Sequence, residues 1–359
     1  MQEKLLQRFL RYVAVPSQSN AANANVPSSE GQRKLAELLK QDLAELGLVD
    51  LEISEYSVLT GKLPAYLPEG CTKEVPAVGW CAHLDTIDIN MSPEIHPQVV
   101  KNYQGGDVCL NKEKDIWIRM AEHPELEKYV GEDIVFTDGT SVLGADNKAA
   151  IANIMVALET IVNEKRYHGD IYVAFVPDEE IGLRGSKKMD FSKFPVKFAY
   201  TIDCCELGEV VYQTFNAGTA IVKIKGVSAH PMSAKGVLIN PTLLAVDLVN
   251  MFDRTQTPEC TEGTEGYIWV KSIVSNDTYA TVTLDIRDHN KKRYEERKAE
   301  IAANAEKLQA MYPRAEVTCT MSDTYGNIND AVTEDNKYCI DYLYLSLIHI
   351  SEPTRHAQI

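Results

Sequence analysis

The sequence of 359 residues has no apolar run long enough to span a membrane, and no signal-peptide core follows its first residues. Its eight cysteines form no C-x-x-C pair, and a bridge between the adjacent Cys204 and Cys205 would be strained, so reduced thiols are the simpler interpretation. Internal repeats and low-complexity segments are also absent from the sequence. We therefore expect a cytoplasmic globular protein.

Positive charge is scarce. The sequence has 36 Lys and Arg residues against 52 Asp and Glu residues, and 36 − 52 gives a net charge of −16. A surface of this sign repels phosphate backbones and anionic lipids, so neither nucleic acid nor a membrane is an expected partner. Solubility is the simple explanation of the acidity, although some carboxylates lie where ligands are expected.

Strands and helices alternate over the first 212 residues. Apolar residues recur at helical spacing in the first 13 residues and in two later segments, and short apolar runs separate these helices. Helices are expected at 30–47 and 149–163, and strands at 75–82, 171–176 and 198–202. This alternation predicts an α/β domain built on a mainly parallel sheet.

The pattern changes after residue 212 to the order β-α-β-β-α-β, which is typical of a ferredoxin-like α+β module. Strands are expected at 219–227, 267–274, 279–287 and 316–321, with helices at 241–254 and 291–312. We therefore predict a first domain over 1–212, an inserted lid domain over 213–323 and a return to the first domain over 324–344, where a helix starts at 330.

The last segment departs from the rest. Residues 345–355 resemble the in-frame translation of a sequencing adapter, and the alternative is a short natural apolar tail. A match over eleven consecutive residues favours the adapter. We therefore expect residues 345–359 to be an artefact, the natural sequence to be truncated near Tyr344, and the chain as given to be inactive.

Metal-type ligands follow the predicted strands of the first domain. His83 and Asp85, Glu179 and Glu180, and Asp203 each come after an apolar run. Because ligands bind at the carboxyl ends of strands in open α/β sheets, these side chains are expected to meet. Singly, each has a simpler explanation as a structural histidine or a solvated carboxylate. Together, several buried carboxylates require a compensating cation, and two divalent metals bridged by one Asp would supply it.

These residues also carry a family resemblance. Residues 79–86 (GWCAHLDT), 143–149 (LGADNKA), 177–182 (PDEEIG) and 200–203 (YTID) resemble the dinuclear zinc aminopeptidase/carboxypeptidase family. Residues 228–236 (SAHPMSAKG) and 285–288 (DIRD) are similar to its peptidase T branch, the tripeptide aminopeptidases. The resemblance runs in matching order from about residue 1 to 344.

The resemblance implies two Zn²⁺ ions per chain. His83, Asp146 and Asp203 would bind the first zinc, and Asp146 would bridge to a second zinc that Glu180 also binds. Family members continue beyond this chain, and the resemblance implies a Gly-rich segment and a further His ligand there. The histidines of the adapter-like tail are not assigned that role.

The remaining roles are implied in the same way. Asp85 would accept the ring N–H of His83, and Glu179 would be the general base. From the lid, His230 would reach the reaction intermediate and Arg287 would pair with the terminal carboxylate of the peptide. Without the resemblance, His230 before a proline indicates a turn residue, and Arg287 indicates a surface ion pair.

The implied function is hydrolysis of the N-terminal residue from tripeptides by a zinc-dependent enzyme, with a homodimer left open. One alternative is another metallo-exopeptidase or an N-acyl amino acid hydrolase on the same scaffold. A different class is a non-catalytic peptide- or metal-binding protein, or an inactive fragment. The presence of Glu179 beside a set of ligands counts against a non-catalytic protein.

Overall fold

The computed structural model describes residues 1–204 and 208–351 of the chain, with the side chains of 347–351 left aside. The chain forms two compact units, Met1–Cys205 and Glu206–Ile359, and each is described by itself. The predicted boundaries at 212 and 323 stay predictions. The part of the predicted tail from residue 352 onward lies outside the described residues.

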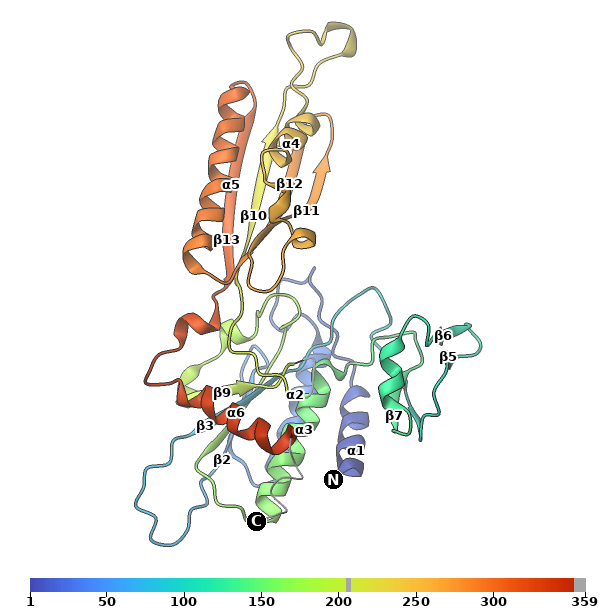
Figure 1. Ribbon diagram of the computed structural model, residues 1–359, viewed down its shortest axis with the longest axis vertical. Helices are drawn as coiled ribbons and strands as arrows, with labels where there is room; N and C mark the ends of the chain where they lie inside the picture. Colours follow the sequence, from blue (N-terminus) through green and yellow to red (C-terminus); the bar gives the residue numbers. More distant parts are fainter. Residues whose placement is uncertain (205–207, 352–359) are drawn as a thin grey trace. The chain divides into compact units, whose positions relative to one another are not determined.

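The first unit is built on a five-stranded sheet in the order β1-β2-β8-β3-β9, of which Figure 1 labels β2, β3 and β9. These strands are β1 (Val49–Ile53), β2 (Leu59–Leu63), β3 (Val78–His83), β8 (Ile171–Val176) and β9 (Phe198–Thr201). β3 pairs in parallel with β8 and β9, whereas the β1–β2 and β2–β8 pairs are antiparallel. The predicted α/β class is confirmed, and the sheet is mixed because a tight turn joins β1 to β2, which only antiparallel neighbours allow.

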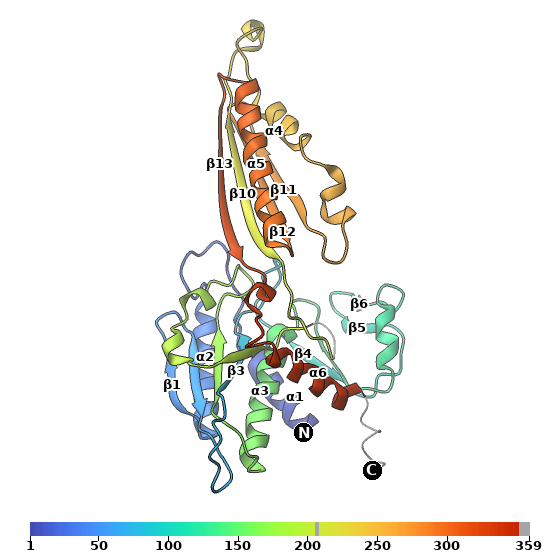
Figure 2. The ribbon, with the colours of Figure 1, turned by 60° about the vertical axis from the view of Figure 1, so that its left-hand side comes forward.

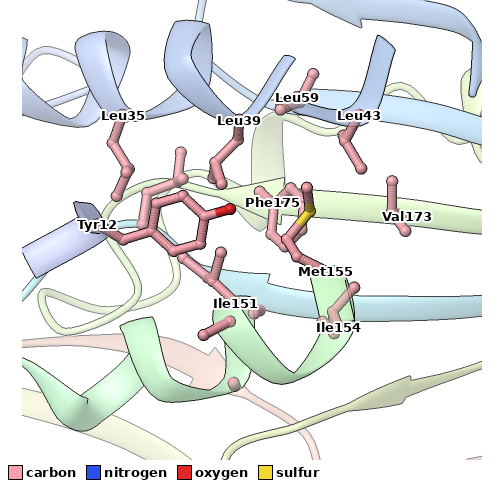
Figure 3. Packing of buried hydrophobic residues seen from close by; sticks show 14 of the residues in the cluster. Tyr12, Leu35, Leu39, Leu43, Leu59, Ile151, Ile154, Met155, Val173 and Phe175 are labelled. Carbon is pink, nitrogen blue, oxygen red and sulfur yellow. The ribbon is translucent and has the colours of Figure 1, made fainter. Parts of the chain in front are cut away.

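Three helices supply the core of this unit, namely α1 (Gln2–Val13), α2 (Glu30–Glu45) and α3 (Ala145–Asn163), so the predicted helices are confirmed. Figure 3 shows leucines of α2 pointing toward apolar side chains of α3, with Tyr12 of α1 between them. The leucines recur every four residues and are fully buried, as the amphipathic pattern requires: Leu35, Leu39 and Leu43. Gly47, at φ +87°, follows the end of α2.

Gly79 of β3 pairs with Ala199 of β9 and is crowded by the ring of Phe194. A Cβ atom added to Gly79 would lie 2.3 Å from Cζ of Phe194 and 2.9 Å from Cβ of Ala199. No side chain fits at that distance, so glycine is required there for the strands to pair.

A segment between β3 and α3 forms two small antiparallel pairs that the sequence patterns did not predict. β4 (Pro97–Val100) pairs with β7 (Ile134–Thr137), and β5 (Val108–Asn111) pairs with β6 (Ile116–Ile118). The strands have three or four residues each, too few for an alternating pattern to be recognised. They enclose a small cluster of their own around Tyr103, Val108 and Phe136.

The second unit contains a four-stranded antiparallel sheet in the order β11-β12-β10-β13 (Figure 2). Its elements are β10 (Asn216–Lys225), α4 (Pro241–Val249), β11 (Tyr267–Ser275), β12 (Tyr279–Asp288), α5 (Lys291–Met311) and β13 (Glu316–Tyr325). Both helices share one apolar cluster with the sheet, so they cover the same face. The order and the layering confirm the predicted ferredoxin-like module.

The last described helix, α6 (Tyr338–Ser351), begins eight residues later than the predicted start at 330. Asn336 explains the delay, because its side chain accepts from the Thr333 N–H at 2.7 Å and donates to the Ala331 carbonyl at 2.9 Å. Local bonds of this kind compete with a helix. None of the described helices is long and apolar enough to cross a membrane.

Candidate metal centre

The candidate site lies at one end of the sheet of the first unit, where three strands finish together. β8, β3 and β9 run parallel, so the residues that follow them meet at the same edge. His83 ends β3, Glu179 and Glu180 follow β8, and Asp203 follows β9. Asp146 reaches the same place from the start of α3, as its contact with His83 shows.

His83 is the centre of this cluster and is 2% exposed. Its Nε2 lies 2.8 Å from Oδ1 of Asp146 and 3.9 Å from Oδ2 of Asp203. Its Nδ1 lies 3.3 Å from Oδ1 of Asp85, close enough for an ion pair but without hydrogen-bond alignment. The two nitrogens therefore face different carboxylates, with Nε2 toward the predicted ligands and Nδ1 toward Asp85.

Asp85 has a second contact that the sequence patterns did not reveal. Its side chain is fully buried, and it accepts the backbone N–H groups of Glu179 at 2.9 Å and Glu180 at 3.1 Å. Hydrogen bonds to a carboxylate are among the stronger ones in proteins. Asp85 therefore fixes the backbone of the turn that presents both glutamates to the cluster.

Asp146 is presented by an irregular start to α3. Gly144 precedes it with φ +71°, and Asp146 and Asn147 both have non-helical dihedral angles. A Cβ atom on Gly144 would lie 3.0 Å from Ile95 and 3.1 Å from Thr86, so the left-handed, crowded position suits glycine. The regular helix begins only after the Asp146 side chain, which is 67% exposed, has turned toward His83.

The charges of the cluster are out of balance. Burial raises the pKa of Glu180 to about 7, and the neighbouring Asp146 carboxylate adds to the rise. Burial likewise raises the pKa of Glu179 and of Asp203. Burial alone would lower the pKa of His83, but the surrounding carboxylates outweigh it and raise that pKa to about 10. Among the cluster residues that the structure describes, one imidazole therefore faces five carboxylates, too little positive charge to balance them.

The donor set suits a divalent metal. Ligand atoms of His83, Asp146 and Glu180 lie within 4.8 Å of one another, and so do those of His83, Glu179 and Asp203. Imidazole and carboxylate are zinc-type ligands. The predicted ligands therefore come together, although their grouping differs from the predicted one because Glu179, predicted as the base, also lies within ligand distance. The assignment of individual roles stays a prediction.

The two predicted lid residues lie in the second unit. His230 is exposed, and its Nδ1 accepts the Met232 N–H at 3.3 Å. Arg287 lies on β12, and its Nη1 donates to the carbonyls of Ile286 at 2.9 Å and Gly218 at 3.3 Å. Their roles toward a substrate stay predictions.

Asp178 is the residue beside the site that sequence reasoning left unassigned. It is fully buried and has a φ of +57°. Its carboxylate points away from the metal ligands to Ser28 and Gln32, which are also buried. One signal could have revealed this contact, since Gln32 lies three residues before Leu35 on the apolar face of α2.

Family models match two parts of the chain. Residues 212–313 match the model of a peptidase dimerisation domain. Residues 120–238 match the model of M42 glutamyl aminopeptidase, and this range includes Asp146, Glu179, Glu180 and Asp203.

Solved structures share the fold at low sequence identity. A tripeptidase of Staphylococcus aureus is 19% identical with a TM-score of 0.74, over 98% of this chain and 82% of that chain. The aminopeptidase PepT of Bacillus cereus is 18% identical with a TM-score of 0.68, over 95% and 80%. A dinuclear metal binding peptidase of Bacillus subtilis from the M20 family is 11% identical with a TM-score of 0.55, over 90% and 74%.

The fold and the carboxylate–imidazole cluster define a metallopeptidase. A peptidase T-like protein of Rhizobium meliloti is 50% identical over 337 residues, which cover 94% of this chain and 81% of that protein. Peptidase T of Fusobacterium nucleatum is 40% identical over 338 residues, or 94% and 80%. This chain belongs to the peptidase T family.

Proposed function

We propose that this protein removes the N-terminal residue from tripeptides and that it holds two zinc ions to do so. The observation that carries the proposal is the convergence of five carboxylates on one buried imidazole, with no lysine or arginine among the cluster residues described above. The tripeptide substrate is supported by the tripeptidase with the same fold and by the peptidase T relatives.

The ligands would be His83, Asp146 and Asp203 for one zinc, and Asp146 with Glu180 for the other. When bound, divalent ions lower the pKa of a coordinated water and stabilise the negative charge that develops on the scissile carbonyl. Asp85 orients His83 through Nδ1 and holds the backbone of the glutamate turn.

Glu179 would take the proton of the attacking water and return it to the leaving amine. Its raised pKa, caused first by burial, suits a carboxylate that must accept a proton near neutral pH. Because Glu179 also lies within ligand distance of His83 and Asp203, a variant that loses turnover but keeps metal is needed to separate the two roles.

Two residues of the second unit complete the proposal. Arg287 would bind the terminal carboxylate of the substrate, and His230 would stabilise the reaction intermediate. Among the described contacts of Arg287, the partners are backbone carbonyls, which leaves its positive charge uncompensated. Arg297 differs, because its Nε donates to buried Asp288 at 2.9 Å and its Nη1 to Gln256 at 2.7 Å.

The test of the proposed function begins with a chelator-treated protein reloaded with zinc. We expect two zinc ions per chain and release of the N-terminal residue from a tripeptide, with no turnover of an N-acyl amino acid. The chain as given is assayed beside a fusion of residues 1–344 to the C-terminal residues of a relative. This comparison is needed because residues 345–359 are predicted to be an artefact. Absence of bound zinc in both forms would contradict the proposal, and bound zinc without hydrolysis would favour a binding protein.

Arg287→Ala tests carboxylate recognition. Loss of a charge-assisted hydrogen bond costs about 1.5–3 kcal/mol, so we expect kcat/KM for a free tripeptide to fall by about 10- to 150-fold. A tripeptide amide, which has no terminal carboxylate, should be affected far less. Arg297→Ala is the matched control, because it removes an arginine of the same unit that already has an acidic partner. Equal losses for both substrates with Arg287→Ala would show that this arginine acts elsewhere.

We further propose a homodimer formed through the second unit, the lid of residues 213–323, and a cytoplasmic location. The match to a peptidase dimerisation domain supports the dimer. β11 is an edge strand in this unit, and its last five residues are exposed, with Val274 at 62%. An exposed apolar edge strand is suited to pair with a second copy. The exposed thiols of Cys71 and Cys260 are consistent with a reducing compartment.

The dimer is tested by sedimentation of the intact protein and of Val274→Lys. A charge at the edge of a sheet opposes pairing with another strand. The control is Val49→Lys, a similarly placed exposed valine on the edge strand β1 of the first unit. A monomeric wild type, or dissociation caused equally by both variants, would contradict an interface at β11.

A further inference from the structure

Asp178 stands out as a buried carboxylate beside the candidate site that binds no ligand of the cluster. It directly precedes Glu179 and Glu180, and its side chain is fully buried. Its backbone is left-handed, with φ at +57°, a conformation that Asp tolerates better than most residues. This turn of the backbone directs its side chain toward the N-terminal part of the unit, away from the two glutamates that follow.

Three donors surround the Asp178 carboxylate. Oδ2 accepts the backbone N–H of Ser28 at 2.8 Å. Oδ1 accepts the Ser28 hydroxyl at 2.5 Å and the Gln32 amide at 2.7 Å. In return, the Gln32 carbonyl oxygen accepts the backbone N–H of Asp178 at 2.9 Å. Gln32 and Asp178 therefore form a closed pair of hydrogen bonds in the interior, where such bonds are strong.

Ser28 links this pair to the loop that leads into α2. Its hydroxyl also accepts the backbone N–H of Asn20 at 2.8 Å, and its carbonyl accepts the Asn23 amide at 2.8 Å. Arg184, on the far side of the glutamate turn, donates to the Asn23 carbonyl at 2.7 Å. Loop 20–28, α2 and the glutamate turn are thus joined in one network of hydrogen bonds.

The glutamate turn is consequently held from two directions. Asp85 binds the N–H groups of Glu179 and Glu180 from the metal side. Asp178, the residue just before them, is held separately by Gln32 and Ser28. With the bonds to Asp85 and the bonds of Asp178 both in place, rotation of the glutamate turn requires that one of the two sets break.

We propose that Asp178, paired with Gln32, is a positioning residue that sets where the Glu179 side chain points. This inference rests on the proposed role of Glu179 as the base. A carboxylate must lie within hydrogen-bond distance of the proton it removes, so a small rotation of the turn is costly. Misplacement by 1 Å can lower the rate by about 10²-fold even when every reacting group is present.

An exchange of amide and carboxylate tests the pair itself. In Asp178→Asn, one orientation of the new amide opposes the Ser28 N–H and the other opposes the Gln32 amide, so a donor meets a donor in both. In Gln32→Glu, two carboxylates face each other. In the double variant, the amide and the carboxylate have changed places with the charge conserved, and each donor again faces an acceptor once the Ser28 hydroxyl turns from position 178 to the carboxylate at position 32. The double variant should therefore restore what each single variant loses.

Two readouts are measured on the full chain. Hydrogen–deuterium exchange of the peptide spanning 177–185, with no substrate present, reports whether the glutamate turn loosens. Turnover of a tripeptide and bound zinc report whether catalysis and metal binding separate. For each single variant we expect faster exchange, unchanged zinc content, unchanged KM and a kcat about 10²-fold lower. The double variant should approach the wild type in exchange rate, zinc content, KM and kcat.

A control separates positioning from general loss of stability. Asp42, on α2, is a second buried carboxylate, bound to Arg11 and Tyr12 away from the cluster. Asp42→Asn should lower the unfolding temperature and leave kcat per folded molecule unchanged. Ser28→Ala, which removes one donor to Asp178 and the acceptor of the Asn20 N–H, is a second variant for the case in which Asp178→Asn does not fold.

The outcomes distinguish this inference from the proposed function. Wild-type kcat in the folded single variants, or failure of the double variant to recover, would overturn the positioning role. A wild type that binds zinc but hydrolyses nothing would instead overturn the proposed function, and hydrogen–deuterium exchange would still show whether the pair holds the turn. Unchanged exchange in both single variants would overturn the inference independently of any activity.

Discussion

Two clusters of carboxylates in the first unit differ in what neutralises them. Between α1, α2 and α3, Asp42 and Glu159 meet three cations from α1. Asp42 binds Arg11 at 2.7 Å, and Glu159 binds Arg8 at 3.0 Å and also Lys4. At the carboxyl ends of the strands, five carboxylates share one imidazole.

The pKa directions follow this difference. Hydrogen bonds from Lys4 and Arg8 lower the pKa of Glu159. Burial and like charges raise the pKa of Glu180 to about 7. The first cluster is complete with protein groups alone, whereas the second is complete only with added positive charge. Acidic residues therefore indicate a metal site by the cations that are missing around them rather than by their number.

The largest expected difference between the two clusters is in turnover, when one glutamate of each is replaced by glutamine. Glu179→Gln removes the proposed base but leaves the proposed ligands, so we expect turnover to fall by about 10²- to 10⁴-fold with zinc retained. Glu159→Gln, the matched change among the cations, should leave turnover unchanged. Tripeptide kinetics with zinc analysis measure both. A Glu179→Gln protein that loses zinc along with activity would make Glu179 a ligand rather than the base.

Removal of metal should destabilise only the strand-end cluster. With free zinc at 100 times its dissociation constant, binding stabilises the folded protein by about 2.7 kcal/mol, and a chelator should abolish this. Without metal, Glu180→Gln should unfold at a higher temperature than the wild type, because one of the crowded negative charges is gone. Thermal unfolding with and without chelator measures both effects. A chelator-insensitive wild type would show that the carboxylates tolerate one another unaided.

Asp42→Asn should have the opposite profile, with lost stability and intact catalysis. It weakens the acceptor of Arg11 and of the Tyr12 hydroxyl, which donates to Asp42 at 2.8 Å. Weakened or unsatisfied buried groups cost about 1–3 kcal/mol, and we expect about 2 kcal/mol here. Urea titration gives the free energy of unfolding, and kcat per folded molecule should stay at the wild-type value. A fall in kcat would mean that the two clusters are coupled.

The smallest expected effect is the loss of stability at low pH that comes from the ion pairs of Glu159. The pKa of Glu159 is lower in the folded protein than its ordinary value, so its ion pairs stabilise the fold above that ordinary value and are lost as pH falls through the folded pKa. Partly exposed pairs contribute about 0.5–1 kcal/mol after screening. Glu159→Gln should therefore lower stability at neutral pH and match the wild type in acid. A constant difference at every pH would show that packing, not charge, explains the loss.

Much of the fold could be predicted from periodicity. Apolar residues at helical spacing marked α1 and α2, and β8 was predicted at its observed bounds of Ile171–Val176. The antiparallel pairing of β2 with β8 could not be predicted, because the two strands lie more than a hundred residues apart in the sequence and no local pattern sets their relative direction. The start of α6 was misplaced because side-chain bonds of Asn336 oppose the helix that its neighbours favour.

The candidate site was predictable in membership but not in geometry. His83, Glu179 and Asp203 could be assigned because each follows an apolar strand, and strand ends meet. The contact of Asp85 with two backbone N–H groups could not be foreseen, since a turn's backbone direction leaves no periodic signal. For the same reason Asp178 seemed one more acidic residue of the motif, although its left-handed backbone turns it away from the others.

Gly79 of β3 lies against the ring of Phe194 and the side chain of Ala199 on β9, with no room for a side chain of its own. His83 is four residues further along β3, about 13 Å away at the rise of a strand. Any side chain at position 79 would separate the two strands and carry Asp203, beyond the end of β9, away from His83. In a survey of tolerated substitutions, position 79 would therefore be as intolerant as a metal ligand. If active-site residues were assigned only from the positions that tolerate no substitution, Gly79 would be included although it contacts no substrate.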